Sequence, residues 1–342
     1  MTDYTAVPVD GPRTGRPRGS GGAPRGRAGI KASRLYQRYR KYRVIVGFLA
    51  PPVGLYAVFV VSPFLQAFFY SVTDWTGVSP ETEFIGMRNY ERLARDPVFW
   101  TALRHNLIVL LTLPVLVLGL SLFLTYLLDF AGGRGPGGAI APVRGARFYR
   151  LVFFFPQVLS VAAVAVLWEY VFAPRGGLLN GVLGAVGPAS WEQNWLGDPD
   201  LALMCVIAVM AWTNVGFFVI VLSSATASIP GDILAAAQLD GAGPARTFVK
   251  VVLPLLWDTV RTGWIYLGIL ALDGSFTVVN IMTVNQGGPD HSTLVLPVYL
   301  YNKAFRDAQA GYASGAGVAL LIVTLLFAAV VLRLGRRERL EF

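Results

Sequence analysis

Six long runs with almost no charged side chains limit what this 342-residue chain can fold into. A helix that crosses about 30 Å of hydrocarbon needs about 20 mostly apolar residues, and each run meets or approaches that length. The runs are residues 44–72, 106–128, 151–168, 201–231, 262–283 and 313–332, and the fifth contains one charged residue, Asp273. The sequence therefore predicts an all-α, polytopic membrane protein of six transmembrane helices.

The composition agrees with a membrane protein. Hydrophobic residues make up 54% of the chain, which is more than a soluble domain of this size usually contains. Eight Trp and 21 Phe suit the aromatic belts at membrane interfaces. The single cysteine, Cys205, lies in an apolar run and excludes an internal disulfide, so we interpret it as a small core residue.

The net charge of +9 lies entirely in the first 43 residues, which hold eleven Lys or Arg against Asp3 and Asp10. This segment is rich in Gly, Pro and Arg with little to bury, so we expect residues 1–43 to be a disordered basic tail. It lacks the apolar core of a signal peptide. Contact with anionic lipid headgroups, or no specific role, is favoured over nucleic-acid binding. The transmembrane domain is expected over residues 44–335, with a short basic C-terminus at 336–342.

The distribution of Lys and Arg between the loops predicts the orientation. With the N-terminus inside, the cytoplasmic segments hold 22 of the 29 basic residues. Both termini are therefore expected in the cytoplasm. The loop between the fourth and fifth spans is expected there too.

That loop, residues 229–256, predicts two short helices. Pro230 and Gly231 end the preceding span, and Asp232 is expected to be the N-cap of "ILAAAQL". Gly241 stands where a helix commonly ends in a left-handed residue, and Pro244 suits the first position of the next helix. The sequence therefore predicts a compact helix-turn-helix between two spans, which by itself is also compatible with a plain interfacial connector.

This loop resembles the EAA loop of binding-protein-dependent ABC transporter permeases. The matching residues are Ala236, Ala237, Asp240, Gly241, Ala242, Phe248, Leu253 and Pro254. The resemblance implies that the loop couples the membrane domain to a cytoplasmic ATPase. Ala235 stands where the family usually has Glu; with Asp232 as N-cap, that Glu would sit at the third helical position and could close a capping box.

Further motifs resemble the carbohydrate branch of these permeases, of the maltose and glycerol-phosphate type. They are "FIGMRNYERLARDPVFWTALRHNL", "YRLVFFFPQVLS", "GGLLNGVLG", "QGGPDHSTLVLPVYLYNKAF" and "GYASGAG", in the family's order. The resemblance implies a second homologous permease subunit, two copies of a cytoplasmic ABC ATPase and an extracytoplasmic sugar-binding protein. It also implies that the loop with Gly287, Gly288 and Pro289 is where the binding protein docks. Between Thr283 and Pro289 the chain is about two residues longer than the family pattern.

The chain shows no sign of its own ATPase. A phosphate-binding loop requires a Lys between Gly and Ser or Thr, and none of the four lysines stands in that context. We expect ATP and Mg²⁺ to be bound by the partner ATPase. The two histidines, His105 and His291, lie at loop edges, so neither a metal site nor a catalytic site is expected.

Asp273 is the first candidate for the substrate path. A carboxylate inside the membrane is costly unless it is paired or wetted, so it usually faces a cavity or a partner. It is interpreted either as an acceptor for sugar hydroxyls or as half of a structural pair with the partner permease. Thr277 and Asn280 follow on roughly the same helical face.

A second candidate for the path is Trp212, Thr213 and Asn214 in the fourth span, since an aromatic ring and an amide together suit a sugar. Hydrogen bonding within the membrane is the alternative role for its polar members. Gln157 and Ser160, beside Pro156, are expected either to kink the third span or to line the path.

Three other readings remain open. An ABC permease for a non-sugar substrate shares all the loop features. A stand-alone secondary transporter is disfavoured because no internal repeat is visible. A membrane-embedded enzyme would need a convergent set of acids, bases or metal ligands, and only Asp273 and Glu169 are acidic in or beside the spans.

Overall fold

The computed structural model describes residues 45–133, 141–283 and 287–334. Every regular element over these residues is a helix, and an isolated bridge joins Thr73 to Phe84. The chain divides into two units, Met1–Pro63 and Phe64–Phe342. The basic tail at 1–43 and the C-terminal segment at 336–342, both expected from the sequence, lie outside the described residues.

The first span is one helix, Ile45–Tyr70, with a π-helical turn η1 (Ala57–Val61) that continues into α2 (Ser62–Tyr70). Its exposed side chains are mainly large and apolar, such as Phe48, Leu65 and Phe69. An apolar surface of this kind suits hydrocarbon rather than water.

The second unit is built around a 34-residue helix, α4 (Pro97–Phe130), which starts earlier than the predicted span at residue 106. The Asp96 Oδ1 atom accepts hydrogen bonds from the backbone N–H groups of Val98 (2.8 Å) and Phe99 (3.3 Å). Pro97 occupies the first position, where a helix needs no N–H donor. The cap therefore extends the helix about two turns beyond the apolar run.

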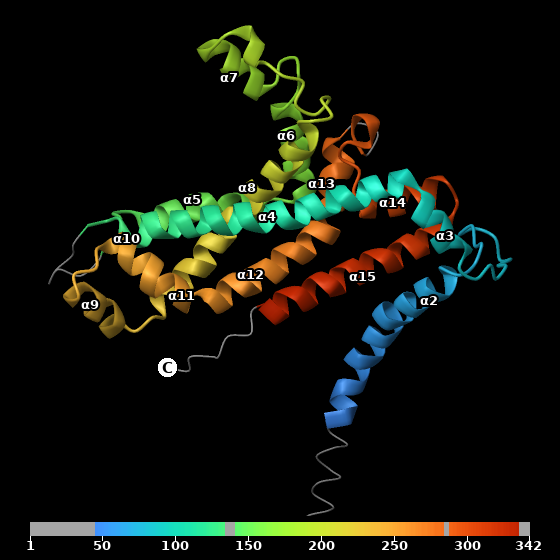
Figure 1. Cartoon of the computed structure of the whole chain (residues 1–342), viewed down its shortest axis with the longest axis horizontal. Coiled ribbons are helices and arrows are strands. Elements are labelled where there is room, and N and C mark those ends of the chain that lie inside the picture. Colours follow the sequence, from blue (N-terminus) through green and yellow to red (C-terminus); the bar gives the residue numbers. More distant parts are fainter. Residues whose placement is uncertain (1–44, 134–140, 284–286, 335–342) are drawn as a thin grey trace, which may run out of the picture. The chain divides into compact units, whose positions relative to one another are not determined.

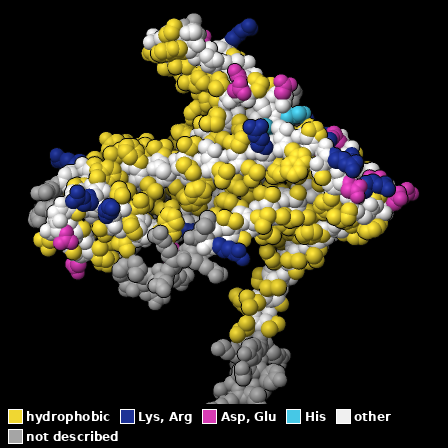
Figure 2. All heavy atoms as spheres, in the orientation of Figure 1, with side chains coloured by type: hydrophobic (Ala, Val, Ile, Leu, Met, Phe, Trp, Pro, Cys, Tyr) yellow, Lys and Arg dark blue, Asp and Glu magenta, His cyan; other side chains and the backbone are white. Residues whose placement is uncertain are grey.

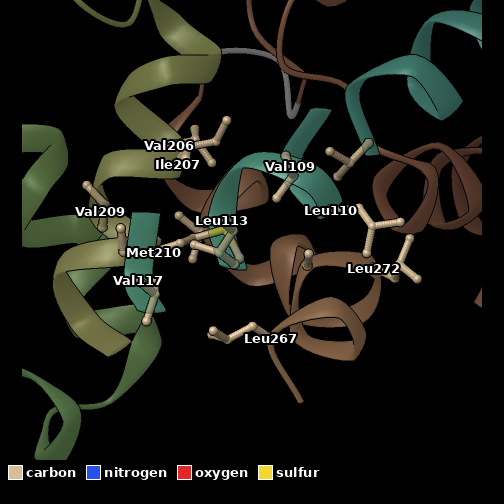
Figure 3. Close-up of a cluster of buried hydrophobic side chains, with 14 of the residues drawn as sticks. Val109, Leu110, Leu113, Val117, Val206, Ile207, Val209, Met210, Leu267 and Leu272 are labelled. Carbon is tan, nitrogen blue, oxygen red and sulfur yellow. The ribbon is translucent and has the colours of Figure 1, made fainter. Parts of the chain in front are cut away.

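The core lies where α4 packs against α8 (Ala202–Ala227) and the fifth span. Figure 3 shows aliphatic side chains of these three helices pointing toward one another. They include Val109, Leu113 and Val117 of α4, Ile207 and Met210 of α8, and Leu267 and Leu272 of the fifth span. Most of them are almost fully buried, so this cluster holds the unit together.

The fifth span comprises α12 (Trp257–Ile269), a π-helical turn η5 (Leu270–Gly274) and α13 (Ser275–Met282), and the sixth is α15 (Ala310–Leu334). Short helices lie at both ends of α4 (Figure 1). One end is close to α9 (Gly231–Leu239), α10 (Pro244–Thr247), η4 (Phe248–Val252) and α11 (Leu253–Leu255). The other end is close to α3 (Arg88–Arg95) and α14 (Leu296–Tyr301). The remaining short elements are α7 (Leu178–Val186), η3 (Ala189–Trp191), η7 (Pro289–His291) and η8 (Asn302–Arg306).

The third span is not the continuous helix that the run at 151–168 predicts. It consists of α5 (Ala146–Val158) and α6 (Val161–Val171), which meet at an angle of 97°. Leu159 is extended (φ −75°, ψ 147°), and Pro156 in the last turn cannot donate a helical hydrogen bond. Of the two roles considered for this region, the kink is therefore confirmed, and six spans result when the bent pair counts as one crossing.

Gly216 of α8 allows α5 to approach closely. A Cβ atom at this position would overlap the backbone carbonyl of Phe153 and the nitrogen of Phe154. A glycine removes that obstacle, so α5 packs directly against α8 before the chain bends.

Hydrophobic side chains cover the long helices, and Lys, Arg, Asp and Glu gather toward the ends (Figure 2). This pattern matches a membrane crossing, in which charged groups stay near the headgroups.

The fully buried Asn106 ties α4 to two other elements. Its Oδ1 atom accepts a hydrogen bond from the backbone N–H of Leu296 at the start of α14 (2.5 Å). Its Nδ2 group donates to the carbonyl of Ala271 in the π-helical turn η5 (3.4 Å). One side chain thus satisfies backbone groups at a helix start and at a helix irregularity, where regular bonding fails.

We expect Asn106→Leu to lower the stability of the protein by about 2–4 kcal/mol, because the Leu296 N–H and the Ala271 carbonyl lose a partner in a buried place. Reaction of the buried thiol of Cys205 with a fluorescent dye during heating measures unfolding in detergent.

The matched control is Ser121→Ala, another fully buried polar residue of α4, whose hydroxyl donates to the Val215 carbonyl (2.9 Å). That carbonyl lies inside a regular helix, so the expected loss is about 1 kcal/mol. Equal losses for both variants would show that Asn106 has no special part in joining the helices.

Candidate functional site

The first part of the site is the turn after α9. The N–H of Gly241 donates to the Gln238 carbonyl and the N–H of Ala242 to the Ala237 carbonyl, each at 3.0 Å. Gly241 has φ of +77°. This is a Schellman motif, and it confirms the prediction that Gly241 ends the helix in the left-handed region.

The predicted N-cap of α9 is wrong. The helix begins at Gly231 with Pro230 in the cap position (φ −54°, ψ 132°), and Asp232 makes no capping hydrogen bond. The fixed φ of proline already turns the chain, so the helix starts two residues earlier than predicted. Asp232 lies in the first turn, where its charge suits the helix dipole. Ala235 is consequently the fifth helical residue, so a Glu there would not sit at the capping-box position.

The helix α9 presents most of its surface outward. None of its residues is buried, and Leu239 at its end is 90% exposed. Ala235 and Ala236 are also exposed, whereas Leu234 packs on the core. A short exposed helix of small side chains with one protruding leucine is suited to sit in a groove of another protein.

Phe248 anchors the segment that follows α9. It is buried, and its ring contacts those of Tyr126 (5.4 Å between centroids) and Phe130 (5.2 Å) near the end of α4. Pro254 lies in α11, from which the chain enters the fifth span. The aromatic cluster therefore connects the loop firmly to the longest helix of the unit.

The second part of the site is a cleft of about 490 Å³ beside the fifth span, which we name the Asp273 cleft. Its lining residues are Asp273, Gly274, Phe276, Thr277, Pro297, Leu300, Tyr301, Ala304 and Phe305. The rings of Phe276 and Tyr301 lie 5.4 Å apart, and those of Tyr301 and Phe305 lie 5.1 Å apart. Asp273 is exposed and has no ion-pair partner among the described residues.

An aromatic wall with one accessible carboxylate and the hydroxyls of Thr277 and Tyr301 suits a small polar ligand with apolar faces. The structure brings the predicted Asp273 and Thr277 together in this cleft. Asn280 does not line it, and its Oδ1 atom is buried without a hydrogen-bond donor among the described residues. Tyr301 and Phe305 were not singled out from the sequence, because they lie outside the predicted spans.

The fourth-span candidates are dispersed. Thr213 and Asn214 are buried, and each side chain donates to the carbonyl four residues earlier in its own helix, Val209 (2.9 Å) and Met210 (2.8 Å). The structure therefore favours a structural role for these two residues. Trp212 lies against the ring of Trp168 and lines a separate apolar groove of about 1010 Å³ between α4, α5 and α8.

The loop after the fifth span is described from Gly287 onward, so most of its predicted extra length, at residues 284–286, lies outside the described residues. Gly288 has φ of +73°, and a Cβ there would crowd the hydroxyls of Ser292 and Thr293. The Thr293 N–H donates to the Gly287 carbonyl (2.9 Å). Gly287, Gly288 and Pro289 thus begin a tight turn of constrained shape.

Asp96 forms a polar cluster that sequence reasoning missed. Its Oδ2 atom accepts hydrogen bonds from the hydroxyls of Tyr299 (2.6 Å) and Tyr312 (2.9 Å). Partial burial opposes ionisation, but these bonds and those from Val98 and Phe99 hold the pKa of the Asp96 carboxyl below its usual range. Burial, followed by the Asp96 carboxylate, raises the pKa of the Tyr299 hydroxyl. The cluster joins the starts of α4 and α15 to α14, the helix that carries Tyr301.

The Asp96 cluster predicts an acid-dependent loss of stability. The folded-state pKa lies below the ordinary value of 3.8, so the stabilisation is complete above that pH and is lost as the pH falls through the folded-state pKa. Thermal unfolding followed by circular dichroism should therefore show the difference between the wild type and Asp96→Asn shrinking in this acidic range.

Tyr312→Phe provides the comparison, because it removes one hydrogen bond to the carboxylate and leaves the charge. Its acid transition should move to higher pH than that of the wild type. A pH-independent difference between wild type and Asp96→Asn would contradict the assignment.

Among the described residues, no group of three or more His, Cys, Asp or Glu is placed to hold a metal ion. His105 instead contacts the Leu294 carbonyl through Nδ1 (3.0 Å), which ties α4 to the loop before α14. Cys205 is buried, in agreement with its predicted place in the core.

The fold and these features define a helical membrane protein with an exposed loop at one end and a polar cleft along one span. Over residues 93–340 the chain matches the family described as binding-protein-dependent transport system inner membrane component. The chain belongs to this family. Its members are transport proteins of the inner membrane, which agrees with the resemblance noted in the sequence.

Two relatives illustrate the similarity. The chain is 37% identical over 338 residues to the diacetylchitobiose uptake system permease protein of Streptomyces coelicolor, covering 98% of this chain and 92% of that protein. It is 32% identical over 291 residues to the multiple sugar-binding transport system permease protein of Streptococcus mutans, covering 85% and 94%.

The fold also resembles that in a crystal structure of a bacterial ABC transporter involved in the import of the acidic polysaccharide alginate. The TM-score is 0.72 at 19% identity, covering 89% of this chain and 99% of that one. A second structure, of an alginate ABC transporter in complex with an alginate pentasaccharide-bound periplasmic protein, gives a TM-score of 0.74 at the same identity, covering 89% and 98%. At this identity the likeness supports the fold alone.

Proposed function

We propose that this chain is a transmembrane permease subunit of an ABC importer for a sugar or oligosaccharide. It would pass its substrate from an extracytoplasmic binding protein to the cytoplasm, driven by ATP hydrolysis on a separate subunit. The names of the two relatives support a saccharide substrate. A non-sugar substrate is the alternative, and it is the outcome to be tested.

The observation that carries the proposal is the Asp273 cleft. It places an accessible carboxylate of the fifth span beside three aromatic rings, one from the same span and two from the α14–η8 segment. The apolar faces of a sugar ring pack on aromatic side chains, and its hydroxyls donate to a carboxylate. The accessible position leaves the carboxylate free to accept hydrogen bonds from a substrate, and a structural pair with the partner permease is the alternative role.

The proposed assembly contains a second homologous permease, two copies of a cytoplasmic ABC ATPase that bind ATP and Mg²⁺, and a sugar-binding protein. The exposed surface of α9 and its Schellman turn support the ATPase contact. The constrained turn at Gly287, Gly288 and Pro289 supports the contact with the binding protein. No catalytic residue is proposed in this chain.

We propose that both termini lie in the cytoplasm, on the basis of the excess of Lys and Arg in the segments on that side. In this orientation α9 and α10 face the cytoplasm. The helices α3 and α14 then face the outside, at the opposite end of α4 (Figure 1).

Gly241→Val should separate a coupling loop from a plain connector. A β-branched residue is strained at φ of +77° by about 1–3 kcal/mol, so the turn after α9 should distort and move Leu239 and the neighbouring surface. We expect the variant to insert into the membrane, to retain little ATPase on co-purification, and to lose uptake together with stimulated ATP hydrolysis.

The matched controls are substitutions at Gly243 and at Gly241 itself, because both positions have room for a side chain. No atom lies within 4 Å of a Cβ at Gly241 or at Gly243, but Gly243 has φ of −72°. Gly243→Val and Gly241→Asn should therefore retain the ATPase, since Asn tolerates the left-handed region. Full ATPase recovery and normal stimulated hydrolysis for Gly241→Val would show that this loop is not the coupling element.

Asp273→Asn should reduce uptake about 10- to 100-fold, since an amide replaces a charged acceptor for sugar hydroxyls. Uptake of radiolabelled diacetylchitobiose and maltose by the complete transporter in proteoliposomes is the measurement. Complex yield should be unchanged, because the carboxylate has no ion-pair partner among the described residues.

Glu169→Gln is the control, because it removes another exposed carboxylate that lies outside the Asp273 cleft. Its uptake should equal that of the wild type. Normal uptake by Asp273→Asn would remove the residue from the path. A fall in complex yield would indicate a structural pair with the partner permease.

A further inference from the structure

The fifth span presents a polar face along its length. Beyond Trp257 at its start, its exposed residues are Asp258, Thr262, Tyr266, Ile269 and Asp273, at intervals of four, four, three and four. This spacing places them on one side of a helix. All of these residues except Ile269 carry polar side-chain atoms, although the helix on which they lie is apolar enough to cross a membrane.

The sixth span provides a direct comparison. The exposed large side chains of α15 are Ile322, Leu325, Leu326, Val330 and Leu332, as expected for a helix facing lipid. Carboxylates and hydroxyls in hydrocarbon cost several kcal/mol, so the exposed face of the fifth span requires water, ligand or protein beside it.

A second cleft lies on this face, toward the start of the span. We name it the Asp258 cleft; its volume is about 410 Å³. Its lining residues are Phe217, Phe218, Val221, Asp258, Thr259, Thr262, Gly263 and Tyr266. Like the Asp273 cleft, it combines one aspartate, at least one threonine and aromatic rings.

The aromatic wall of the Asp258 cleft is held in place by packing. The Tyr266 ring lies 6.0 Å from the rings of both Phe217 and Phe218 of α8. A Cβ at Gly263 would come within 2.8 Å of the Phe218 ring of α8 and 2.9 Å of Leu118 of α4, so this glycine lets α12 pack closely on both helices. The wall therefore belongs to the folded core and does not depend on a loop.

The polar groups of the Asp258 cleft remain accessible. The Asp258 carboxylate pairs with Arg261 at 3.2 Å, yet its side chain is 64% exposed. The Thr262 hydroxyl donates to the Asp258 carbonyl (2.8 Å), so its oxygen lone pairs remain free to accept from a ligand. Acceptors beside an aromatic wall again suit the hydroxyls and the apolar faces of a sugar.

We propose that the Asp258 cleft is a second saccharide subsite, separate from the Asp273 cleft and on the cytoplasmic half of the same helical face. The two aspartates are 15 residues apart, which corresponds to roughly 22 Å along a helix and exceeds the length of a disaccharide. The substrate would therefore bind first in the Asp273 cleft and then in the Asp258 cleft. The inference rests on the proposed saccharide import.

Substrate protection of a cysteine tests the subsite. In a Cys205→Ser background, Thr262→Cys in the complete transporter is labelled with a water-soluble thiol reagent in inside-out vesicles without nucleotide. We expect saturating diacetylchitobiose or maltose, whichever the wild type takes up, to slow labelling about tenfold. Arg144→Cys, exposed and outside both clefts, should react equally with and without sugar.

Two results of the labelling would overturn the proposal. If Thr262→Cys reacts with the reagent and sugar does not slow the reaction, the cleft is open to water but does not bind the sugar. Thr262→Cys that never reacts would mean that the second permease covers this face. Absence of wild-type uptake for both sugars would instead overturn the proposed function, and the second subsite with it.

Aromatic substitution gives an independent test. Tyr266→Ala should lower uptake about tenfold and abolish protection of Thr262→Cys, while Tyr266→Phe should recover most of the loss because it keeps the ring. Tyr266→Leu retains apolar volume against Phe217 and Phe218 but has no ring face. If Tyr266→Leu showed the same uptake and the same protection of Thr262→Cys as Tyr266→Phe, the Tyr266 ring would serve only to pack against its neighbours. That result would overturn the proposed subsite.

Discussion

The structure depends on one constraint: inside hydrocarbon, every backbone N–H and carbonyl must find its hydrogen-bond partner within the protein. The crossings are therefore helices, and departures from helical bonding occur where other groups compensate. The third span breaks after α5, more than one helical turn beyond the place where Gly216 lets α5 touch α8. The fifth span contains the π-helical turn η5, whose Ala271 carbonyl receives a hydrogen bond from Asn106. Both irregularities lie next to helices of the buried core, since α5 packs on α8 and η5 packs on α4.

The long helix α4 connects the two parts of the candidate site. Near its start, Asn106 holds α14 and the π-helical turn η5, and these two elements form the walls of the Asp273 cleft together with α13 and η8. Near its end, Phe130 packs on Phe248 in the segment after α9. A 34-residue helix spans roughly 50 Å, so α4 packs both on the segment after the loop proposed to meet the ATPase and on η5 and α14, which form part of the cleft proposed to meet the sugar.

Several features of the site were predictable from the sequence because they depend on local chemistry. Gly241 ends α9 in the left-handed region since glycine adopts that conformation at the least cost. Asp273 and Thr277 share a cleft because four residues make about one helical turn. Local reasoning was wrong at Asp232, where the fixed geometry of Pro230 starts the helix earlier. The polar pair Thr213 and Asn214 was ambiguous in the sequence, and both side chains bond within their own helix.

The sequence by itself determined the helical membrane class, the positions of the spans and the form of the loop after the fourth span, because hydrophobic run length and turn chemistry are local properties. Only the tertiary structure decided what the remaining polar groups do. Tyr301 and Phe305 come from α14 and the adjoining π-helical turn η8, outside the predicted spans, and they reach Asp273 because Asn106 and the Asp96 cluster hold α14 in place. The Asp258 cleft likewise exists only where α12 closes on α8 at Gly263. Contacts between residues far apart in the chain depend on packing, which hydropathy and spacing do not encode.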